Sequence, residues 1–113
     1  MHRQVYKWSL QSAQGIQIGA IVKVEDFLEA KKPAYKLFVD FGEKGIKKSS
    51  AQITKLYKKE ELIGKQIIGV VNFPVKQIAN FTSEFLTTGF VEENGEVVLA
   101  IPERKVKNGL KLA

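Results

Sequence analysis

The amino-acid sequence predicts a small, mostly β protein whose strands close into a five-stranded barrel. Two segments, residues 16–27 and 35–41, alternate apolar and polar side chains with the two-residue period of a half-buried strand. Residues 66–73 form a nearly continuous apolar run rich in β-branched side chains, which suits a strand covered on both faces. Glycine, proline and asparagine turn signals separate these runs at short intervals.

The N-terminal part of the sequence predicts a helical extension, residues 1–15, ahead of a barrel domain at residues 16–113. Val5, Trp8 and Leu10 recur at close to helical spacing, and Gly15 is a suitable end for a short helix. Such a helix is marginal by itself, so we expect it to dock on the barrel or on a second subunit.

Each of the first two strands predicts one row of side chains that faces the core. In the first strand this row consists of Ile16, Ile18, Ala20, Val22 and Val24. In the second strand it consists of Tyr35, Leu37, Val39 and Phe41, with Lys36, Phe38 and Asp40 on the opposite face.

The middle of the chain predicts a third strand followed by a short helix. Residues 46–53 are more polar and carry lysines, and Thr54 can cap a helix over residues 55–62 that ends at Gly64. A helix between the third and fourth strands is the ordering of the OB-fold, a five-stranded barrel. An all-β sandwich is the alternative, because periodicity alone does not separate the two architectures.

The fourth strand leads into a polar loop that predicts a binding surface. Pro74 ends the strand because proline cannot donate a hydrogen bond to a sheet ladder. Residues 74–84 then form the loop, and residues 85–91 the fifth strand. Asn94-Gly95 predicts a type I′ hairpin that joins this strand to residues 97–101.

The residue inventory argues against an enzyme, a metal site and a bound cofactor. The 113-residue chain has no cysteine, and its only histidine is His2 at the N-terminus. The carboxylate pairs are sequence neighbours, which do not face each other on a strand or helix: Glu25 with Asp26, Glu60 with Glu61, and Glu92 with Glu93. We therefore expect no catalytic residues.

The chain lacks the sequence signals of a membrane or secreted protein. No apolar segment approaches the roughly 20 residues needed to span a bilayer, and the first part of the chain lacks a signal-peptide pattern. The absence of cysteine suits a reducing compartment. These observations predict a cytoplasmic protein without membrane insertion.

The net charge of +6 predicts an acidic partner, and the excess comes from one region. Residues 31–59 carry nine lysines against Asp40 and Glu43, which leaves +7. Residues 1–30 carry three bases and three acids, and residues 60–113 carry six bases and seven acids. A solvated lysine face without a ligand is the usual alternative for such a run.

A nucleic acid is the first ligand class that this charge and an OB-type barrel predict. Lysines would bind phosphates, amide and hydroxyl groups would contact bases or sugars, and Phe38 would stack on a base if it faces outward. A core position for Phe38 is the alternative. The candidate contact residues are Lys36, Lys47, Lys48, Ser49, Ser50, Gln52, Asn72, Lys76, Gln77, Asn80 and Ser83.

An unfolded polypeptide is the second ligand class, and it needs an exposed apolar groove, ideally at a dimer seam. Val75, Ile78 and Phe81 lie in an otherwise polar loop. Alternatively, they fold the loop back on the barrel or are buried in a two-fold interface. The candidates for a groove or seam are Phe73, Val75, Ile78, Phe81, Phe85, Leu86 and Phe90.

Four segments are long and unusual enough to indicate a family. They are AYKLFVDFG at residues 34–42, GIKKSSAQITKLY at 45–57, IIGVVNFPVKQIANFTSE at 67–84 and IPERKVKNGLKL at 101–112. In these segments the chain resembles the CsaA family, within the wider EMAP-II-like group of tRNA-binding domains. Three positions depart from the wider group: Phe85 replaces a glycine, Leu86 a methionine and Gln17 an arginine.

The resemblance implies an OB-fold homodimer that binds tRNA and needs no cofactor. It also implies chaperone activity toward unfolded or pre-export polypeptides, without catalysis. The alternatives are a general single-stranded nucleic-acid-binding OB-fold protein and a purely peptide-binding chaperone.

Overall fold

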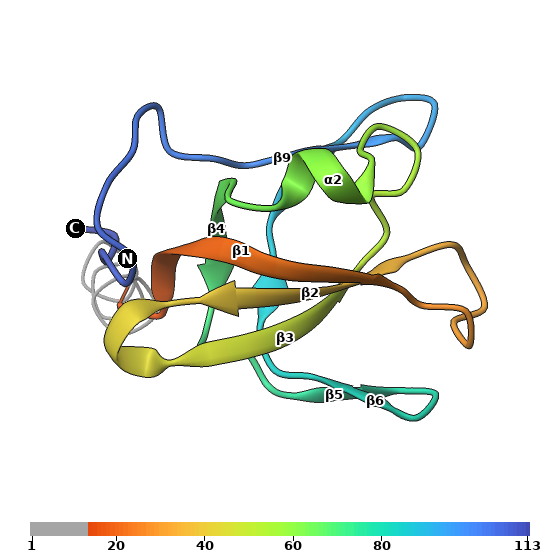
Figure 1. Ribbon diagram of the computed structural model, residues 1–113, viewed down its shortest axis with the longest axis horizontal. Coiled ribbons are helices and arrows are strands. Elements are labelled where there is room, and N and C mark those ends of the chain that lie inside the picture. Colours follow the sequence, from red (N-terminus) through yellow and green to blue (C-terminus); the bar gives the residue numbers. More distant parts are fainter. Residues whose placement is uncertain (1–13) are drawn as a thin grey trace, which may run out of the picture.

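The fold is built around one antiparallel sheet that curls until its two edge strands approach each other (Figure 1). The computed structural model describes residues 14–113. The strands of the main sheet follow the order β3 (Ile46–Ala51), β2 (Tyr35–Asp40), β1 (Ile16–Asp26), β4 (Gln66–Val70) and β7 (Leu86–Thr87). The prediction of a mostly β protein with a nearly closed five-stranded sheet is therefore confirmed.

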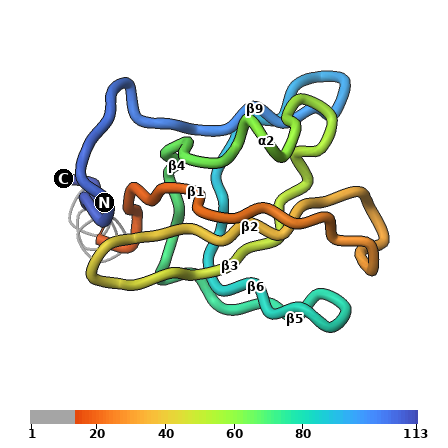
Figure 2. The backbone as a smooth tube through the Cα atoms, viewed as in Figure 1, coloured from red at the N-terminus to blue at the C-terminus, as the bar shows by residue number. Residues whose placement is uncertain are grey.

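Two hairpins and two short helical segments complete the described chain. The hairpins are β5 (Lys76–Ile78) with β6 (Phe81–Ser83), and β8 (Gly89–Val91) with β9 (Val97–Leu99). The helical segments are η1 (Gly42–Lys44), between β2 and β3, and α2 (Lys59–Leu62), between β3 and β4. Figure 2 shows the β5–β6 hairpin and β9 on opposite sides of the barrel. Neither helical segment of the described chain is long and apolar enough to cross a membrane.

Helix α2 has four residues and covers only the second half of the helix expected over residues 55–62. The first half is a turn followed by Tyr57, which bonds at both its backbone and its side chain. The Tyr35 hydroxyl donates to the Tyr57 carbonyl at 2.8 Å, and the Leu99 amide donates to the Tyr57 hydroxyl at 3.0 Å. These bonds hold the segment between β3 and α2 against β2 and β9. In a helix that began at residue 55, the Tyr57 carbonyl and hydroxyl would point in other directions and could not make these bonds. The helix expected over residues 1–15 falls outside the described residues, apart from a turn at its last two positions.

The core contains the row of side chains predicted for the second strand. Tyr35, Leu37 and Val39 are buried, and Phe41 is buried just beyond the end of β2. Each fully buried side chain of this size contributes about 1.5–3 kcal/mol of hydrophobic stabilisation. The other members of this core cluster are Ile21, Ala51, Ile53, Leu62, Ile67, Phe85 and Leu99.

The core-facing row predicted for the first strand is wrong at every member except Val24. Gln17, Gly19 and Ile21 are the buried residues there, whereas Val22 is exposed. A β-bulge after Ile21 in the pairing of β1 with β2 shifts the alternation, so that Val24 packs against the core again. The sequence pattern alone contains no signal for this extra residue.

Gly19 takes a core position because the Val39 side chain and the Phe41 ring fill the space that a side chain would need. A Cβ on Gly19 would lie 2.8 Å from this ring, and a Cβ on Gly69 of β4 would also lie 2.8 Å from it. Phe41 meets Phe85 edge-on, with 4.9 Å between the ring centroids. Two glycines therefore make room for one phenylalanine in the interior of the barrel.

The C-terminal segment pairs with the start of β1. The Ile18 amide donates to the Leu110 carbonyl at 3.0 Å, and the Gly109 amide donates to the Ile18 carbonyl at 2.7 Å. Gly109 has a φ of +89°, and a Cβ on it would lie 2.6 Å from the Phe41 carbonyl oxygen. This segment therefore closes the end of the barrel next to η1 (Figure 1).

The barrel closes between β3 and residues 83–87 mainly through side chains rather than through a backbone ladder. The Ser50 amide donates to Ser83 Oγ at 3.2 Å, and the Lys48 amide donates to the Glu84 carboxylate at 3.0 Å. Thr87 Oγ1 donates to Ser49 Oγ at 3.1 Å. The first two bonds satisfy N–H groups on an edge of β3 that has no strand ladder, and the Glu84 amide donates to the Lys48 carbonyl at 2.7 Å. We call the set the polar seam: Lys48, Ser49, Ser50, Ser83, Glu84 and Thr87.

The turn at Asn94-Gly95 is a hairpin, but it is not the predicted type I′ turn. A type I′ turn needs positive φ at both central residues, and only Gly95 has it, at +87°. The Gly95 amide donates to the Glu92 carbonyl at 2.9 Å, which is the pattern of a type I turn followed by a glycine bulge. The strand predicted over residues 85–91 is split into β7 and β8, so the hairpin stands outside the main sheet.

Replacing Gly109 by alanine should destabilise the fold more than the same change at Gly64. Both residues have positive φ, which costs alanine about 1–2 kcal/mol, but a Cβ on Gly64 would meet no atom within 4 Å. The overlap with the Phe41 carbonyl should add about 1–3 kcal/mol for Gly109→Ala. Urea unfolding of both variants measures this difference, and equal destabilisation would contradict the close approach.

Ser83→Ala should cost about 1–3 kcal/mol of unfolding free energy, because it leaves the Ser50 amide without its acceptor. Thr82→Ala is the matched control, because the neighbouring Thr82 hydroxyl bonds only the exposed Gln77 side chain. The control should stay within about 0.5 kcal/mol of the parent. Thermal unfolding measures both changes, and a neutral Ser83→Ala variant would show that the seam does not stabilise the barrel.

Candidate nucleic-acid interface

The outward side chains of β1, β2 and β3 form a basic face. Lys23, Phe38 and Lys48 lie opposite one another across the three strands, and Lys36 pairs with Ser50 in the next row. We call these five residues the outer face. Phe38 is half-buried on this face and does not belong to the core, so the outward alternative for this residue is the correct one.

Two ammonium groups of the outer face converge on one aromatic ring. Lys36 Nζ lies 5.4 Å from the Phe81 ring centroid, and Lys48 Nζ lies 5.2 Å from the same centroid. Lys36 Nζ is also 5.1 Å from the centroid of Phe27. These distances fall within the roughly 6 Å range of cation–π attraction. The rings therefore help to hold both lysines in place.

The β5–β6 hairpin, which sequence reasoning treated as a loop, supplies Phe81. This ring packs against Phe27 with 5.2 Å between centroids, in a small buried cluster with Ala34 that is separate from the main core. The hairpin strands have three residues each, too few for a period-two pattern to be recognised. The hairpin and the loop between β1 and β2 thus meet at one end of the barrel.

Lys36 and Lys48 have no carboxylate within 4.0 Å among the described residues. The Asp26 carboxylate accepts a hydrogen bond from Lys59 and raises the pKa of the Lys59 ammonium above its ordinary value. Lys36 and Lys48 thus have no competing ion pair in the described residues and are available for an anionic ligand. The ion pairs found in residues 14–113 are Lys23 with Glu25 at 3.0 Å, Lys59 with Asp26 at 2.8 Å, and Arg104 with Glu103.

Two of the predicted contact residues lie inside the protein. Ser49 is 1% exposed and Ser83 is 9% exposed. Ser49 Oγ donates to the Ser50 carbonyl at 3.2 Å, and Ser83 Oγ donates to the Phe85 carbonyl at 3.4 Å. They hold residues 83–87 against β3. Ser50 and Lys48, on the same strand, contribute their side chains to the outer face and only backbone groups to the polar seam.

The predicted hairpin residues Lys76, Gln77 and Asn80 are exposed. Thr82 Oγ1 donates to Gln77 Oε1 at 2.7 Å, and Gln77 Nε2 donates to the Ala79 carbonyl at 2.9 Å, so this amide is held at the hairpin tip. Because β6 lies beside β3, these side chains extend the surface that begins at the outer face.

Lys47 lies on the opposite side of β3 from Lys48, as successive residues of a strand do. It pairs with Val39 of the core row and lines a pocket of about 260 Å³ together with Asn72. Gln52 lies at a third place, in a pocket that also contains Lys32. The structure therefore does not gather all predicted contact residues on one surface.

Sequence reasoning missed Lys23 as a member of the outer face. Its Nζ lies 5.1 Å from the Phe38 ring centroid, and its salt bridge to Glu25 keeps it along β1. The register of β1 against β2 brings Lys23 opposite Phe38, and that register includes the bulge. Neither strand sequence indicates this pairing by itself.

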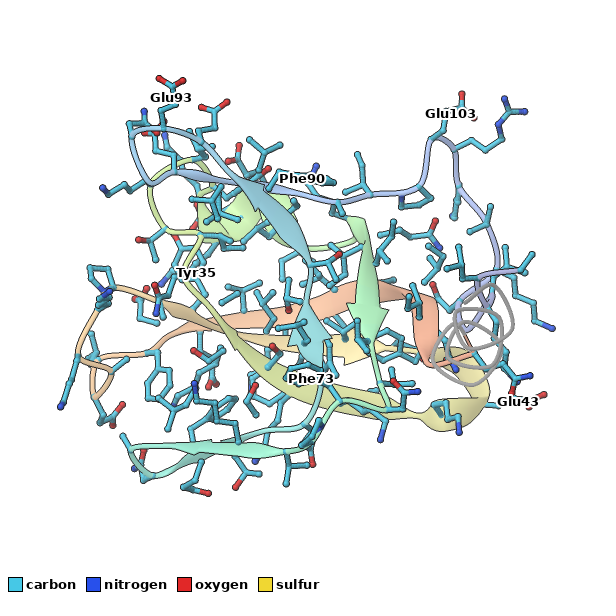
Figure 3. All side chains as sticks on the ribbon, turned by 180° about the vertical axis from the view of Figure 1, so that it is seen from behind. Tyr35, Glu43, Phe73, Phe90, Glu93 and Glu103 are labelled. Carbon is cyan, nitrogen blue, oxygen red and sulfur yellow. The ribbon has the colours of Figure 1, made fainter. Side chains whose placement is uncertain are left out.

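The apolar candidates do not form one surface. Phe81 and Phe85 are buried inside the subunit, at 5% and 3% exposure. Phe73 and Phe90 lie on different sides of the barrel, the first toward β5–β6 and the second toward α2 (Figure 3). Phe90 is 70% exposed and lies opposite Val98 in the β8–β9 hairpin. Of the other candidates, Ile78 is half-buried, and Val75 and Leu86 are exposed.

The comparison with known structures points to CsaA proteins. The chain is similar to the chaperone CsaA of Bacillus anthracis, with 52% identity and a TM-score of 0.83 over 87% of this chain and 89% of that chain. It is also similar to the CsaA chaperone protein of Picrophilus torridus, with 49% identity and a TM-score of 0.82 over 100% of this chain and 98% of that chain.

The curated relatives include methionine–tRNA ligases. The ligase of Nanoarchaeum equitans is 33% identical over 97 residues, which make up 86% of this chain and 12% of the ligase. The chain thus spans only a small part of these enzymes, and its type of module is non-catalytic. The profile of the family described as "Putative tRNA binding domain" matches residues 16–111. The chain therefore belongs to the tRNA-binding domain family, as its resemblance to CsaA proteins predicted.

Proposed function

We propose that this protein binds tRNA through the outer face and the β5–β6 hairpin. Lys36 and Lys48 bind backbone phosphates, and Phe38 offers the exposed part of its ring to a base or a sugar. The convergence of the two lysines on Phe81, without carboxylate partners among residues 14–113, is the observation that carries this proposal. A tRNA ligand also implies a cytoplasmic protein.

The architecture supports this choice of surface. We assign the barrel to the OB-fold, because its sheet order is β3-β2-β1-β4-β7 and a helix lies between β3 and β4. OB-folds bind oligonucleotides on the face of their second and third strands, between two flanking loops. Here the flanking segments are residues 27–34 and the β5–β6 hairpin.

The double variant Lys36→Gln with Lys48→Gln should bind tRNA at least about tenfold more weakly, because it removes two phosphate contacts. The slope of log affinity against log salt should fall by about 2 in magnitude, since each lost contact lowers it by about 1. Gel shifts with bulk tRNA at several salt concentrations measure both quantities.

Lys65→Gln with Lys105→Gln is the matched control, because it makes the same change in charge beside another pocket. This control should keep the affinity and the salt slope of the parent. If both double variants lose affinity equally, tRNA responds to net charge and not to the outer face. A single-stranded oligonucleotide that competes as well as tRNA would favour a general single-stranded nucleic-acid-binding protein.

We further propose that the β8–β9 hairpin joins two copies of the chain. The dimer interface formed in this way would bind unfolded or pre-export polypeptides. Phe90 and Val98 face each other across the hairpin, and Val91 beside them is 73% exposed. Exposed apolar side chains of this kind mark protein-binding surfaces. The two related structures named as CsaA chaperones support this second activity.

Phe90→Ser should convert a homodimer of twice the 12.7 kDa chain mass into monomers and weaken binding of an unfolded polypeptide. Ile46→Ser is the control, because Ile46 is 62% exposed but lies on β3, away from this hairpin. Sedimentation equilibrium gives the mass, and protection of a denatured test protein from aggregation gives the chaperone activity. A parent protein that sediments as a monomer would refute the proposed dimer interface at the β8–β9 hairpin.

A further inference from the structure

We propose that the end of the barrel next to η1 contains a second site, which takes a ribose phosphate. Two adjoining pockets, of about 480 Å³ and 260 Å³, lie there and share Gln17, Lys44 and Lys111 as lining residues. In Figure 3 this end is marked by Glu43, beside the C-terminal segment. The outer face lies elsewhere, on the outward side of β1, β2 and β3.

The lining of these pockets is basic. Lys47 adds a third ammonium group to the smaller pocket, and Lys107 adds one to the larger pocket. Glu43 is the only carboxylate residue among the lining residues described. None of these lysines belongs to an ion pair in residues 14–113. Such a group of lysines favours a phosphate over a neutral or cationic ligand.

A buried amide supplies the second observation. Gln17 is 2% exposed, and its Nε2 donates to the Gln14 carbonyl at 3.1 Å. Its Oε1 is the buried side-chain acceptor that has no hydrogen-bond partner in the described chain. The bond to Gln14 is the only one that the Gln17 side chain makes in the described chain, so turning the amide toward either pocket breaks a single hydrogen bond. An acceptor in this position favours a ligand that brings its own O–H or N–H donor.

These two requirements together define the ligand class. An ionised phosphate ester carries no O–H, so its phosphate group would satisfy the lysines and leave Gln17 Oε1 without a donor. A ribose phosphate carries both groups a few bonds apart. We assign the donor to the 2′-hydroxyl, which is the only free sugar hydroxyl within an RNA strand and which a deoxyribose phosphate lacks. The source is either a free nucleotide or the backbone of an RNA. In the second case the inference rests on the proposed tRNA binding.

The test uses the full isotope-labelled chain and three probes: adenosine 5′-monophosphate, its 2′-deoxy analogue and inorganic phosphate. The ribonucleotide should shift the amide signals of Gly42, Lys44 and Lys111 in a saturable way. The deoxynucleotide should bind about tenfold more weakly, the size expected for one lost hydrogen bond to a buried acceptor. Lys44→Glu with Lys111→Glu should remove the shifts, and Lys65→Glu with Lys105→Glu should keep them.

Gln17→Met tests the amide directly, because methionine is close to glutamine in shape and has no oxygen. In this variant the ribonucleotide and the deoxynucleotide should bind equally. If the variant does not fold, the affinities of the parent chain for the two nucleotides still show whether the site recognises the 2′-hydroxyl. No saturable shift at this end of the barrel, or equal binding of all three probes by the parent, would overturn the ribose-phosphate site.

Two further measurements separate the sources and the two proposals. If Lys44→Glu with Lys111→Glu weakens tRNA binding about tenfold or more, the site takes the RNA backbone. If this variant keeps the tRNA affinity of the parent but no longer binds adenosine 5′-monophosphate, the site binds a free nucleotide. In a third outcome, the variant Lys36→Gln with Lys48→Gln binds the nucleotide and also keeps the tRNA affinity of the parent. This result would support the site at the barrel end and refute the proposed tRNA binding by the outer face.

Discussion

The fold depends on how the outer edge of β3 is satisfied. A strand at the edge of a sheet presents N–H and C=O groups that need partners, and a closed barrel normally supplies them from another strand. In this protein β7 has only two residues, so the polar seam does most of this work with hydroxyl and carboxylate groups. Because these groups come from residues 83–87, closing the barrel also brings the β5–β6 hairpin and its Phe81 ring to the outer face. Stability and the position of the lysines therefore depend on the same bonds.

Much of the fold follows from periodicity, and the failures have physical causes. The row from Tyr35 to Phe41 is predicted correctly because every second residue is large and apolar, and the partner strands bury it on one side. The first strand misleads because its apolar residues at 16, 18 and 20 are only half-buried, while Gly19 and Gln17 face inward. Hydropathy alone predicts that Gly19 and Gln17 face outward. Gly19 is instead needed in the interior to make room for a ring, and Gln17 is a buried polar residue. The β5–β6 hairpin was missed because its strands are too short to show a period.

For the candidate site, too, the sequence predicts some features and not others. The lysine excess of residues 31–59 predicts the region of the proposed interface, since composition needs no knowledge of register. The arrangement of individual lysines does need it. Lys47 and Lys48 are neighbours in the sequence, yet one faces a pocket at the barrel end and the other faces Phe81. Lys23 joins the outer face only through its pairing with Phe38 across a bulged strand. Pairings between distant segments decide such details, and a single sequence does not contain them.

The edge-on contact of Phe41 with Phe85 links the interior of the barrel to the hairpin. Phe85 follows Ser83 and Glu84 directly, and its ring lies against the ring that Gly19 and Gly69 make room for. A methyl group added at either glycine would displace Phe41 and, through Phe85, the residues that clamp the hairpin to β3. In a selection for altered RNA affinity, variants should therefore arise at these two interior positions as well as at the surface. Adaptation of the ligand surface in this protein is constrained by the volume of its core.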